Sequence, residues 1–391
     1  MTLKQLIVIK VGTSTLMKVG FDSTGKEFQR VNLPNMGALV DTVATLHGEG
    51  YGVIIVTSAA VGFGCLKLKL ATRPTTLARK QAVAAAGQSS LIRMYEDLFA
   101  VYGVPVAQIL LSRFDFSAKD RYANVHAAIT DLLEMGVIPI INENDTVSTA
   151  ELRFGDNDTL SALVAVGIGA SKLFLLTDVD CLYTDNPRTN PTAVPVLEVS
   201  PSELAGLNTG GTTATGGQWG TGGMATKLIA ARTAVCAGIE TVLSHGAFPS
   251  RIIDYLHAPV CAPACVPVCT IFRANRESGL SMNRRWMLAL PVLGVLVIDA
   301  GARAALVHQS SLLGAGIVAV EGKFLRDECV EIRHDGIVIG RALVNLDSTE
   351  IDKIKGLKSK EYFEVLKFHA EPEIAYRSNI ILTANSDVLD L

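Results

Sequence analysis

The stretch Leu6-Ile7-Val8-Ile9-Lys10-Val11-Gly12-Thr13-Ser14 opens the 391-residue chain with an apolar run that ends in a lysine and a glycine. A run without polar alternation is typical of a strand buried on both faces of a sheet. Similar short runs recur at residues 53–56, 106–111, 137–141 and 173–176. Segments of helical period lie between them, at residues 36–48, 79–102, 125–135 and 159–168. This alternation predicts an α/β fold with a mostly parallel sheet sandwiched by helices.

The pattern changes near residue 294. Short strand patterns at residues 294–298, 329–333 and 338–341 are separated by turns that contain Gly and Asp, which predicts a small, mostly-β domain. The polar stretch at residues 273–285 is the candidate linker. We therefore predict a large domain at 1–275, a linker at 276–293, a small domain at 294–370 and a tail of unknown structure at 371–391. Residues 204–222 are rich in Gly and Thr and predict a mobile loop.

The composition argues against several classes of protein. The formal net charge of −3 favours neither nucleic acid nor an anionic membrane as a partner. The longest apolar run, residues 286–298, contains Pro291 and is shorter than the roughly 20 residues of a membrane-spanning helix. The amino terminus shows no signal-peptide pattern, so we expect a cytoplasmic protein.

The seven cysteines are an odd number without a secretory context, and we expect reduced thiols. Cys261, Cys265 and Cys269 have helical spacing, but Pro263 and Pro267 exclude a helix there. We therefore expect no metal site in this segment.

Ligands of a parallel sheet bind beyond the carboxyl ends of its strands. Lys10 stands at such an end, and Gly12 allows backbone amides to approach an anion. A second glycine-rich turn, Thr221-Gly222-Gly223-Met224-Ala225-Thr226-Lys227, precedes an apolar helical pattern and suits a phosphate at a helix amino terminus. Its spacing differs from that of a Walker loop. The alternative interpretation of Lys10 is a solvated lysine at the end of a strand, and that of residues 221–227 is an ordinary glycine loop.

Polar side chains follow the other strands. Asn142-Glu143-Asn144-Asp145 ends one apolar run, and Gly155-Asp156-Asn157-Asp158 comes shortly afterwards, where a helix begins. Thr177-Asp178 and Thr57-Ser58 end two more strands. Helix capping explains one such residue. Two clusters of this kind predict a site for a polar ligand.

These motifs, in this order, resemble the glutamate 5-kinases of the amino acid kinase fold. The resemblance covers roughly residues 5–370 and includes Val56-Thr57-Ser58, Ala86-Gly87-Gln88-Ser89 and the motifs quoted above. Residues 294–370 resemble the PUA domain of that family through Asp299-Ala300-Gly301-Ala302, Ser310-Ser311-Leu312-Leu313 and Gly322. The chain departs from the family at Ala59, where glycine is usual, and in the glycine- and threonine-rich loop 204–220.

The resemblance implies ATP-dependent phosphorylation of the side-chain carboxylate of L-glutamate to γ-glutamyl phosphate, the first step of proline biosynthesis. Lys10 and Lys227 would flank the moving phosphoryl group, Asp178 would orient these lysines, and Mg2+ would bridge the nucleotide phosphates. No general base is needed, because a glutamate carboxyl with a pKa of about 4.3 is ionised at neutral pH.

The family's binding residues match two sets of positions in this chain. For glutamate, the implied residues are Ser58, Asn142, Asp145, Asn157 and Asp158, with Asp145 facing the ammonium group. For the nucleotide, they are Lys10, Gly12, Thr13, Thr177, Asp178, Thr221, Gly222, Gly223, Met224, Ala225, Thr226 and Lys227. The resemblance also implies feedback inhibition by proline and a homo-oligomer, either a dimer or a tetramer.

Two alternatives stay open at this stage. A sibling kinase would act on acetylglutamate, aspartate or a nucleoside monophosphate, but the motif at residues 142–145 and the PUA-like domain argue against it. An RNA-binding role would rest on the PUA-like domain. Residues 294–370 carry acidic and basic residues in similar numbers and show no basic stripe with aromatics, which argues against that role.

Overall fold

The computed structural model describes residues 3–21, 27–70, 72–112, 115–116, 119–147, 157–185, 187, 190, 192–207, 223–258, 268–274, 286–288, 290 and 292–382. Thr221, Gly222, Cys261 and Cys265 therefore lie outside the described residues. The chain divides into two compact units, Met1–Glu277 and Ser278–Leu391. Within the described residues, no helix has both the length and the apolar composition needed to cross a membrane.

An eight-stranded sheet forms the centre of the larger unit and confirms the predicted α/β class. Its strand order is β10 (Glu198–Val199), β12 (Thr270–Phe272), β11 (Glu240–His245), β7 (Lys172–Thr177), β1 (Leu6–Val11), β4 (Gly52–Val56), β6 (Ile138–Glu143) and β5 (Val106–Leu111). The six strands from β11 to β5 are parallel, whereas β12 runs antiparallel to β11. The carboxyl ends of these six strands therefore meet at one edge of the sheet.

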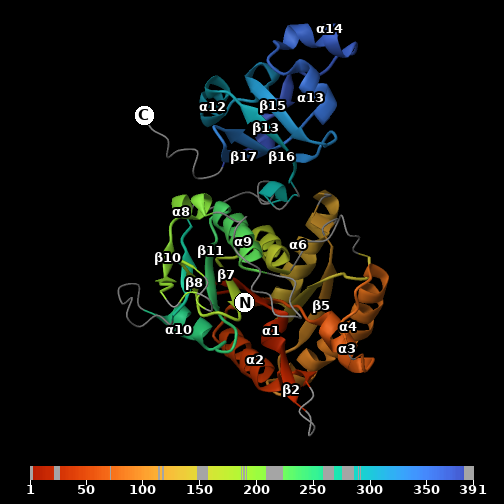
Figure 1. Ribbon diagram of the computed structural model, residues 1–391, viewed down its shortest axis with the longest axis vertical. Helices are drawn as coiled ribbons and strands as arrows, with labels where there is room; N and C mark the ends of the chain where they lie inside the picture. Colours follow the sequence, from red (N-terminus) through yellow and green to blue (C-terminus); the bar gives the residue numbers. More distant parts are fainter. Residues whose placement is uncertain are drawn as a thin grey trace. The chain divides into compact units, whose positions relative to one another are not determined.

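Helices cover both faces of the sheet (Figure 1). On one face lie α6 (Lys119–Glu134), α7 (Asn157–Ile168) and α9 (Met224–Cys236). The other face carries α2 (Leu33–Gly48), α4 (Leu77–Ala100) and the shorter α3 (Ala60–Lys67) and α10 (Arg251–His257). The remaining elements are α1 (Thr13–Leu16), α8 (Pro201–Gly206) and the paired strands β2 (Met17–Phe21) with β3 (Glu27–Val31) and β8 (Leu182–Tyr183) with β9 (Pro195–Val196).

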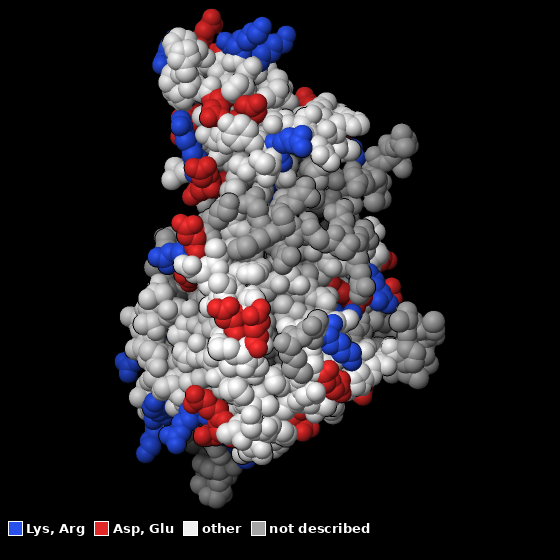
Figure 2. Space-filling model, turned by 180° about the vertical axis from the view of Figure 1, so that it is seen from behind, with Lys and Arg blue, Asp and Glu red and all other residues white. Residues whose placement is uncertain are grey.

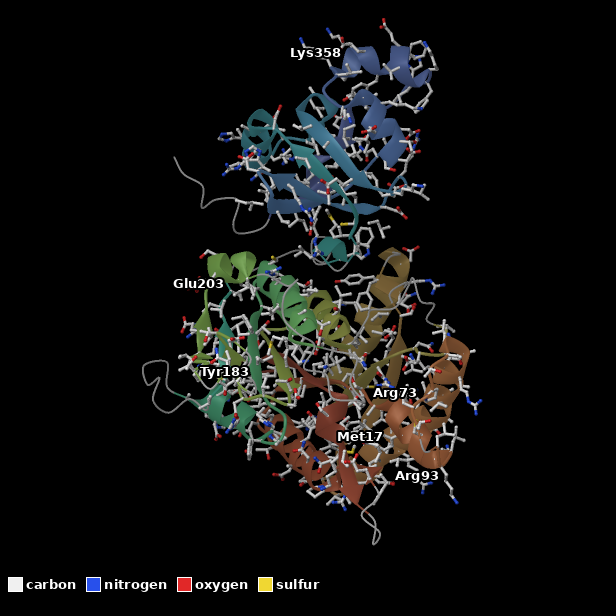
Figure 3. All side chains as sticks on the ribbon, viewed as in Figure 1. Met17, Arg73, Arg93, Tyr183, Glu203 and Lys358 are labelled. Atoms are coloured by element: carbon white, nitrogen blue, oxygen red, sulfur yellow. The ribbon has the colours of Figure 1, made fainter. Side chains whose placement is uncertain are left out.

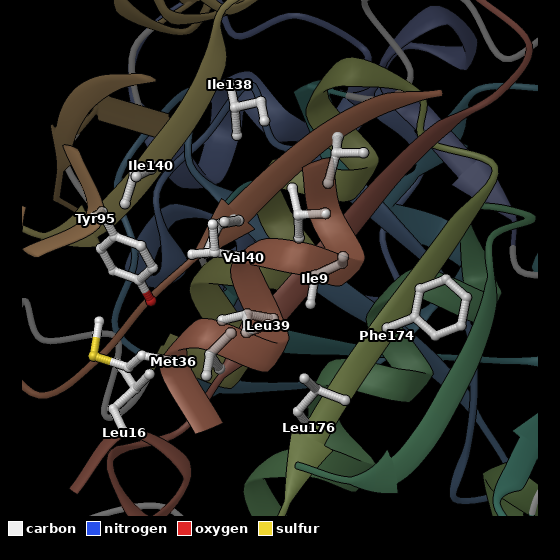
Figure 4. Packing of buried hydrophobic residues seen from close by; sticks show 14 of the residues in the cluster. Ile9, Leu16, Met36, Leu39, Val40, Tyr95, Ile138, Ile140, Phe174 and Leu176 are labelled. Atoms are coloured by element: carbon white, nitrogen blue, oxygen red, sulfur yellow. The ribbon is translucent and has the colours of Figure 1, made fainter. Parts of the chain in front are cut away.

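The core of the larger unit lies between the sheet and α2 (Figure 4). Ile9 and Phe174 point from β1 and β7, and Met36 and Leu39 point from α2; all are fully buried. Burial of one such side chain stabilises the fold by about 1.5–3 kcal/mol. These contacts fix the ends of β1 and β7, where the polar motifs follow.

Part of the predicted mobile loop is a helix. Glu203, labelled in Figure 3, lies in α8 and forms a capping box with Ser200. Leu204 in the same helix is buried. Helix α8 therefore includes residues 204–206 of the segment expected as a loop, because the cap and the buried leucine outweigh the glycine-rich sequence that follows.

The smaller unit is β-rich. Its five-stranded sheet has the order β15 (Ile317–Gly322), β13 (Val292–Ile298), β16 (Cys329–His334), β17 (Ile337–Leu343) and β19 (Ile380–Leu382). Strand β14 (Leu312–Leu313) pairs with β18 (Glu373–Ala375). Short helices α12 (Ala300–Val307), α13 (Ser348–Ile354) and α14 (Tyr362–Leu366), and the 3-10 turns η2 (Gly314–Gly316), η3 (Ser359–Glu361) and η4 (Arg377–Asn379), complete this unit. On the face shown in Figure 2, basic and acidic side chains are interspersed.

Part of the segment whose structure was left open, residues 371–391, forms strands. Residues 373–382, which show no clear pattern in the sequence, supply β18 and β19. Ile374 and Ala375 are fully buried in the core of this unit. The strands are only three residues long, which is too short for a periodic pattern to appear.

Candidate active site

The candidate site lies beyond the carboxyl ends of β1, β4, β6 and β7. Lys10 lies near the end of β1, Ser58 follows β4, and Asn142 lies near the end of β6. Helices α7 and α9 begin at the same place, with Asn157 and Asp158 in the first turn of α7 and Lys227 in the first turn of α9. Helix α7 packs against both β1 and α9, so these residues converge although they are far apart in the sequence.

Two lysines share one carboxylate at the centre of the site. Lys10 Nζ lies 2.5 Å from Asp158 Oδ1, and Lys227 Nζ lies 3.1 Å from Asp158 Oδ2. The side chain of Asp158 is fully buried, and those of Lys10 and Lys227 are 5% and 8% exposed. Water therefore screens these charges weakly, and the cluster carries a formal charge of +1.

Two opposing effects act on Asp158. Burial favours the protonated carboxyl, but the positive charges of Lys10 and Lys227 and their hydrogen bonds favour the carboxylate. The lysines prevail, and the pKa of Asp158 is held well below its usual range. Asp158 is therefore ionised at neutral pH and holds both ammonium groups at fixed positions.

These contacts give Asp158 a role that the sequence analysis did not predict for it. The carboxylate in ion-pair contact with both lysines is Asp158, which the sequence analysis assigned to the substrate. Asp178 follows β7 and accepts a hydrogen bond from the Thr177 hydroxyl at 3.2 Å. Asp158 meets both lysines because α7 packs against β1 and α9, which places the first turn of α7 beside Lys10 and Lys227.

The glycine-rich turn and the start of α9 hold Lys227. Gly223 is the N-cap of α9, and Met224, Ala225 and Thr226 precede Lys227 in its first turn. The Thr226 hydroxyl makes hydrogen bonds to Gly223 O at 2.7 Å and to Asp158 Oδ2 at 3.0 Å. Thr226 thus joins α9 to the same carboxylate as the lysines.

The first glycine turn lies beside Lys10. Gly12 is the N-cap of the short helix α1, which begins at Thr13. A Cβ added at Gly12 would lie 3.6 Å from Lys10 Nζ, so the backbone passes close to the ammonium group. Backbone amides in this turn can therefore face the same anion as Lys10.

A second group of side chains forms a chain of hydrogen bonds beside the lysines. Asn157 Nδ2 donates to Ser58 Oγ at 3.0 Å and to Asn142 Oδ1 at 3.1 Å. Asn142 Nδ2 donates to Gln88 Oε1 at 2.8 Å. The structure thus joins three predicted residues, Ser58, Asn142 and Asn157, with one that was not predicted to bind, Gln88.

A cavity of about 370 Å3 adjoins this chain of amides. Asp145 is half-buried and lines the cavity together with Glu143, Asn144 and Gln88. Gln88 reaches the cavity because α3 and α4 approach closely: a Cβ on Gly87 would collide with the carbonyl oxygen of Ala60. The glycine directly before Gln88 was the sequence signal for this approach.

Ala59 adopts an unusual backbone conformation beside Ser58. Its φ of 81° and ψ of 7° are in the left-handed region, and it is the N-cap of α3. This region costs a residue with a Cβ about 1–2 kcal/mol. Its methyl group is buried in the core. The turn that presents Ser58 therefore carries strain at a residue that lacks the freedom of glycine.

Within the described residues, no group of three His, Cys, Asp or Glu side chains could hold a metal ion. The carboxylate at the centre of the site is in contact with two lysines. This donor set fits a magnesium ion that is bound chiefly by nucleotide phosphates and water.

Comparisons with known proteins show which families and relatives the chain matches. The model of the amino acid kinase family matches residues 5–245, and that of the PUA domain matches residues 294–366. The chain is 45% identical over 381 residues to a glutamate 5-kinase of Rippkaea orientalis, covering 97% of this chain and 99% of that protein. It is 44% identical over 384 residues to a glutamate 5-kinase of Synechocystis sp., covering 97% of this chain and 98% of that protein.

Among solved structures, a carbamate kinase of Giardia lamblia matches with a TM-score of 0.49 at 16% identity, covering 69% of this chain and 99% of that chain.

Proposed function

Because the chain belongs to the amino acid kinase family and, within it, to the glutamate 5-kinases, we propose that it transfers the γ-phosphoryl group of ATP to the side-chain carboxylate of L-glutamate. The observation that carries this proposal is the buried Lys10–Asp158–Lys227 cluster beside the amides of Asn142 and Asn157. The product, γ-glutamyl phosphate, is the first intermediate of proline biosynthesis.

The lysines supply the electrostatics of transfer. The transferred phosphoryl group carries its charge on peripheral oxygens, so catalysis depends on positioned positive charge. Lys10 and Lys227 are already held by Asp158. They would contact the phosphoryl oxygens from opposite sides, together with the amides of Gly12, Thr13 and Gly223. Asp158 is a positioning residue in this scheme, because it acts through the lysines.

ATP would bind along the strand ends and glycine turns. Thr177 and Asp178 would contact the nucleotide, and the first turn of α9 would face its phosphates. Thr221 and Gly222 belong to the same proposal. Mg2+, bound to the phosphates, supplies further neutralisation of charge. The residues of this chain that hold the phosphates in place are Lys10, Lys227 and the amides of both turns.

Glutamate would occupy the cavity beside the amide chain. The carboxylate of Asp145 would face the ammonium group, and Ser58, Asn142 and Asn157 would bind the carboxylates. Phosphoryl transfer needs no general base here, because the acceptor carboxyl, with a pKa of about 4.3, is already ionised. Because Asp145 would face a charged ammonium group, the site would favour glutamate, which has a free amine, over acetylglutamate, which does not.

Purified protein with ATP, Mg2+ and a panel of amino acids tests the proposal. Hydroxylamine converts an acyl phosphate into a hydroxamate, so only a true acceptor gives both ADP and hydroxamate. We expect both products with L-glutamate, and far less with acetylglutamate or aspartate. ADP without hydroxamate in the presence of glutamate would contradict transfer to a carboxylate.

Two proposals rest on the family alone. Proline would inhibit by competing in the region of the glutamate site, and the chain would form a homo-oligomer, either a dimer or a tetramer. Inhibition that glutamate relieves, and a mass by light scattering of two or four chains, are the expected results. Proline that leaves the rate unchanged, or a monomer, would contradict them.

A further inference from the structure

From the contacts of Asn35, we infer that this residue positions the phosphate-binding turn after β1 against the ends of β7 and β11, and so governs affinity for the nucleotide. The inference rests on the proposed ATP site. It concerns a side chain on α2 that has no contact with the lysine cluster among the contacts described above.

Asn35 makes two hydrogen bonds with one amide group. Its Nδ2 donates to Thr15 O at 2.9 Å and to Gly246 O at 2.8 Å. The residue is 8% exposed. A primary amide has two N–H donors, so both are used, and each satisfies a carbonyl oxygen in a buried place. Buried hydrogen bonds are costly to lose, because the freed group then lacks water as a partner.

The first carbonyl belongs to the turn that follows Lys10. Thr15 lies in α1, and its amide donates to Gly12 O at 3.1 Å. A shift of Thr15 would therefore move Gly12 and Thr13, whose amides are proposed to face the phosphates. Two side chains at the start of α2 donate to the Thr15 carbonyl oxygen and so connect the four-residue helix α1 to α2. The bond from Asn35 Nδ2 is the shorter, at 2.9 Å, and that from Asn32 Nδ2 is 3.4 Å long.

The second carbonyl belongs to the turn that follows β11. Gly246 donates its own amide to Thr177 O at 2.7 Å, so this turn is fixed to the end of β7. A Cβ at Gly246 would collide with the side chain of Thr15, which shows how closely this turn packs on α1. Asn35 therefore joins two backbone segments that border the proposed nucleotide site from different sides.

Helix α2 provides a rigid support for this amide. Met36 and Leu39, labelled in Figure 4, are fully buried beside β1 and β7. Asn35 also lies in the first turn of α2, where its backbone N–H donates to Asn32 O at 3.1 Å. The core thus fixes the position of the Asn35 side chain. Its two hydrogen bonds in turn fix the turns that contain Thr15 and Gly246.

The test compares Asn35→Asp with wild type. Aspartate keeps the shape but places an acceptor oxygen where Nδ2 faces the two carbonyl oxygens, so both bonds are lost and repulsion replaces them. We expect the Kd and KM for MgATP to rise about tenfold or more, as for the loss of buried hydrogen bonds worth about 1 kcal/mol each. The KM for glutamate should stay within about threefold of wild type.

Two controls separate positioning from general stability. Val43→Ala removes two buried methyl groups from α2 at a position away from both turns. It should lower stability without moving the two turns. Asn32→Ala removes only the longer bond to Thr15 O. Both controls should keep the wild-type KM for MgATP. If Asn35→Asp does not fold, Asn35→Ala deletes the same donors without adding charge and carries the test.

Several outcomes would overturn the inference. One is a folded Asn35 variant whose affinity for MgATP equals that of wild type; another is an equal rise in KM for glutamate; a third is the same loss of affinity in Val43→Ala. Calorimetry with MgATP alone keeps the two proposals apart. A wild type that binds MgATP but does not phosphorylate glutamate refutes the acceptor and leaves the role of Asn35 measurable. A wild type that binds no MgATP overturns this inference.

Discussion

Lys10 Nζ and Asp158 Oδ1 lie 2.5 Å apart, although Lys10 lies near the end of a strand and Asp158 lies in the first turn of a helix far along the chain. Lys227 contacts the second oxygen of the same carboxylate. One buried aspartate thus fixes two cations. Removing one partner of a buried ion pair typically costs about 3–5 kcal/mol, because the remaining charge is left uncompensated.

The two lysines should dominate turnover. Lys10→Ala or Lys227→Ala should each lower kcat by about 100-fold or more, as for the loss of one preorganised charge partner in a transition state. Steady-state kinetics with saturating ATP and glutamate measure this. Lys353→Ala, an exposed lysine of the smaller unit, is the control and should keep wild-type kcat. Near-normal turnover of a folded Lys10 or Lys227 variant would remove that lysine from the mechanism.

Asp158 should make the stability of the protein depend on acid pH. Its pKa is lowered in the folded state, so its contribution to stability is present above the unfolded pKa of about 3.9 and is lost as pH falls below that value. Between about pH 4 and pH 2, the free energy of unfolding of wild type should fall by up to about 1.4 kcal/mol per pH unit more than that of Asp158→Asn. Denaturant titrations at several pH values measure both slopes. Equal slopes would contradict this role of Asp158.

Asp145 should determine the choice of substrate. Asp145→Asn keeps the shape but removes the charge that faces the ammonium group, so the KM for glutamate should rise about 30-fold or more, which corresponds to about 2 kcal/mol. The KM for ATP should barely change. Acetylglutamate lacks the ammonium charge and should be a very poor substrate of wild type. An unchanged KM for glutamate in the variant, or equal use of both substrates, would refute this assignment.

Ala59 and Ala60 form a matched pair for measuring backbone strain. Both are buried, at 7% and 3% exposure, and glycine removes one methyl group at either position. Only Ala59 has a left-handed backbone. Ala59→Gly should therefore be less destabilising than Ala60→Gly by about 1 kcal/mol or more. Thermal or denaturant unfolding measures the difference, and equal losses would show that the conformation of Ala59 carries no strain.

The smaller unit should be dispensable for phosphoryl transfer. Every proposed site residue precedes residue 275, and Met1–Glu277 is a compact unit. A chain that ends at residue 275 should therefore keep glutamate-dependent ADP formation and the hydroxamate signal, although assembly or regulation can change. The full-length protein is the control. A folded shortened chain without either signal would show that the smaller unit contributes to the active site.

The sequence by itself determined the features that depend on local pattern. Unbroken apolar runs such as residues 6–9 and 173–176 lie within β1 and β7, because a parallel sheet buries such strands on both faces. Gly12 and Gly223 are the N-cap residues of α1 and α9, and a helix start of this kind also depends on the local sequence. The fold class and the family predicted from these motifs are confirmed.

Only the tertiary structure decided which polar groups meet. The sequence analysis gave the lysine-orienting role to Asp178 and assigned Asp158 to the substrate, but the packing of α7 against β1 and α9 brings Asp158 into contact with both lysines. The bonds of Asn35 to Thr15 and Gly246, and the pairing of β18 with β14 and of β19 with β17, likewise join segments far apart in the sequence. A periodic pattern shows which face of an element is buried. Which distant group lies opposite that face depends on how the elements pack, and this is decided only when the whole core assembles.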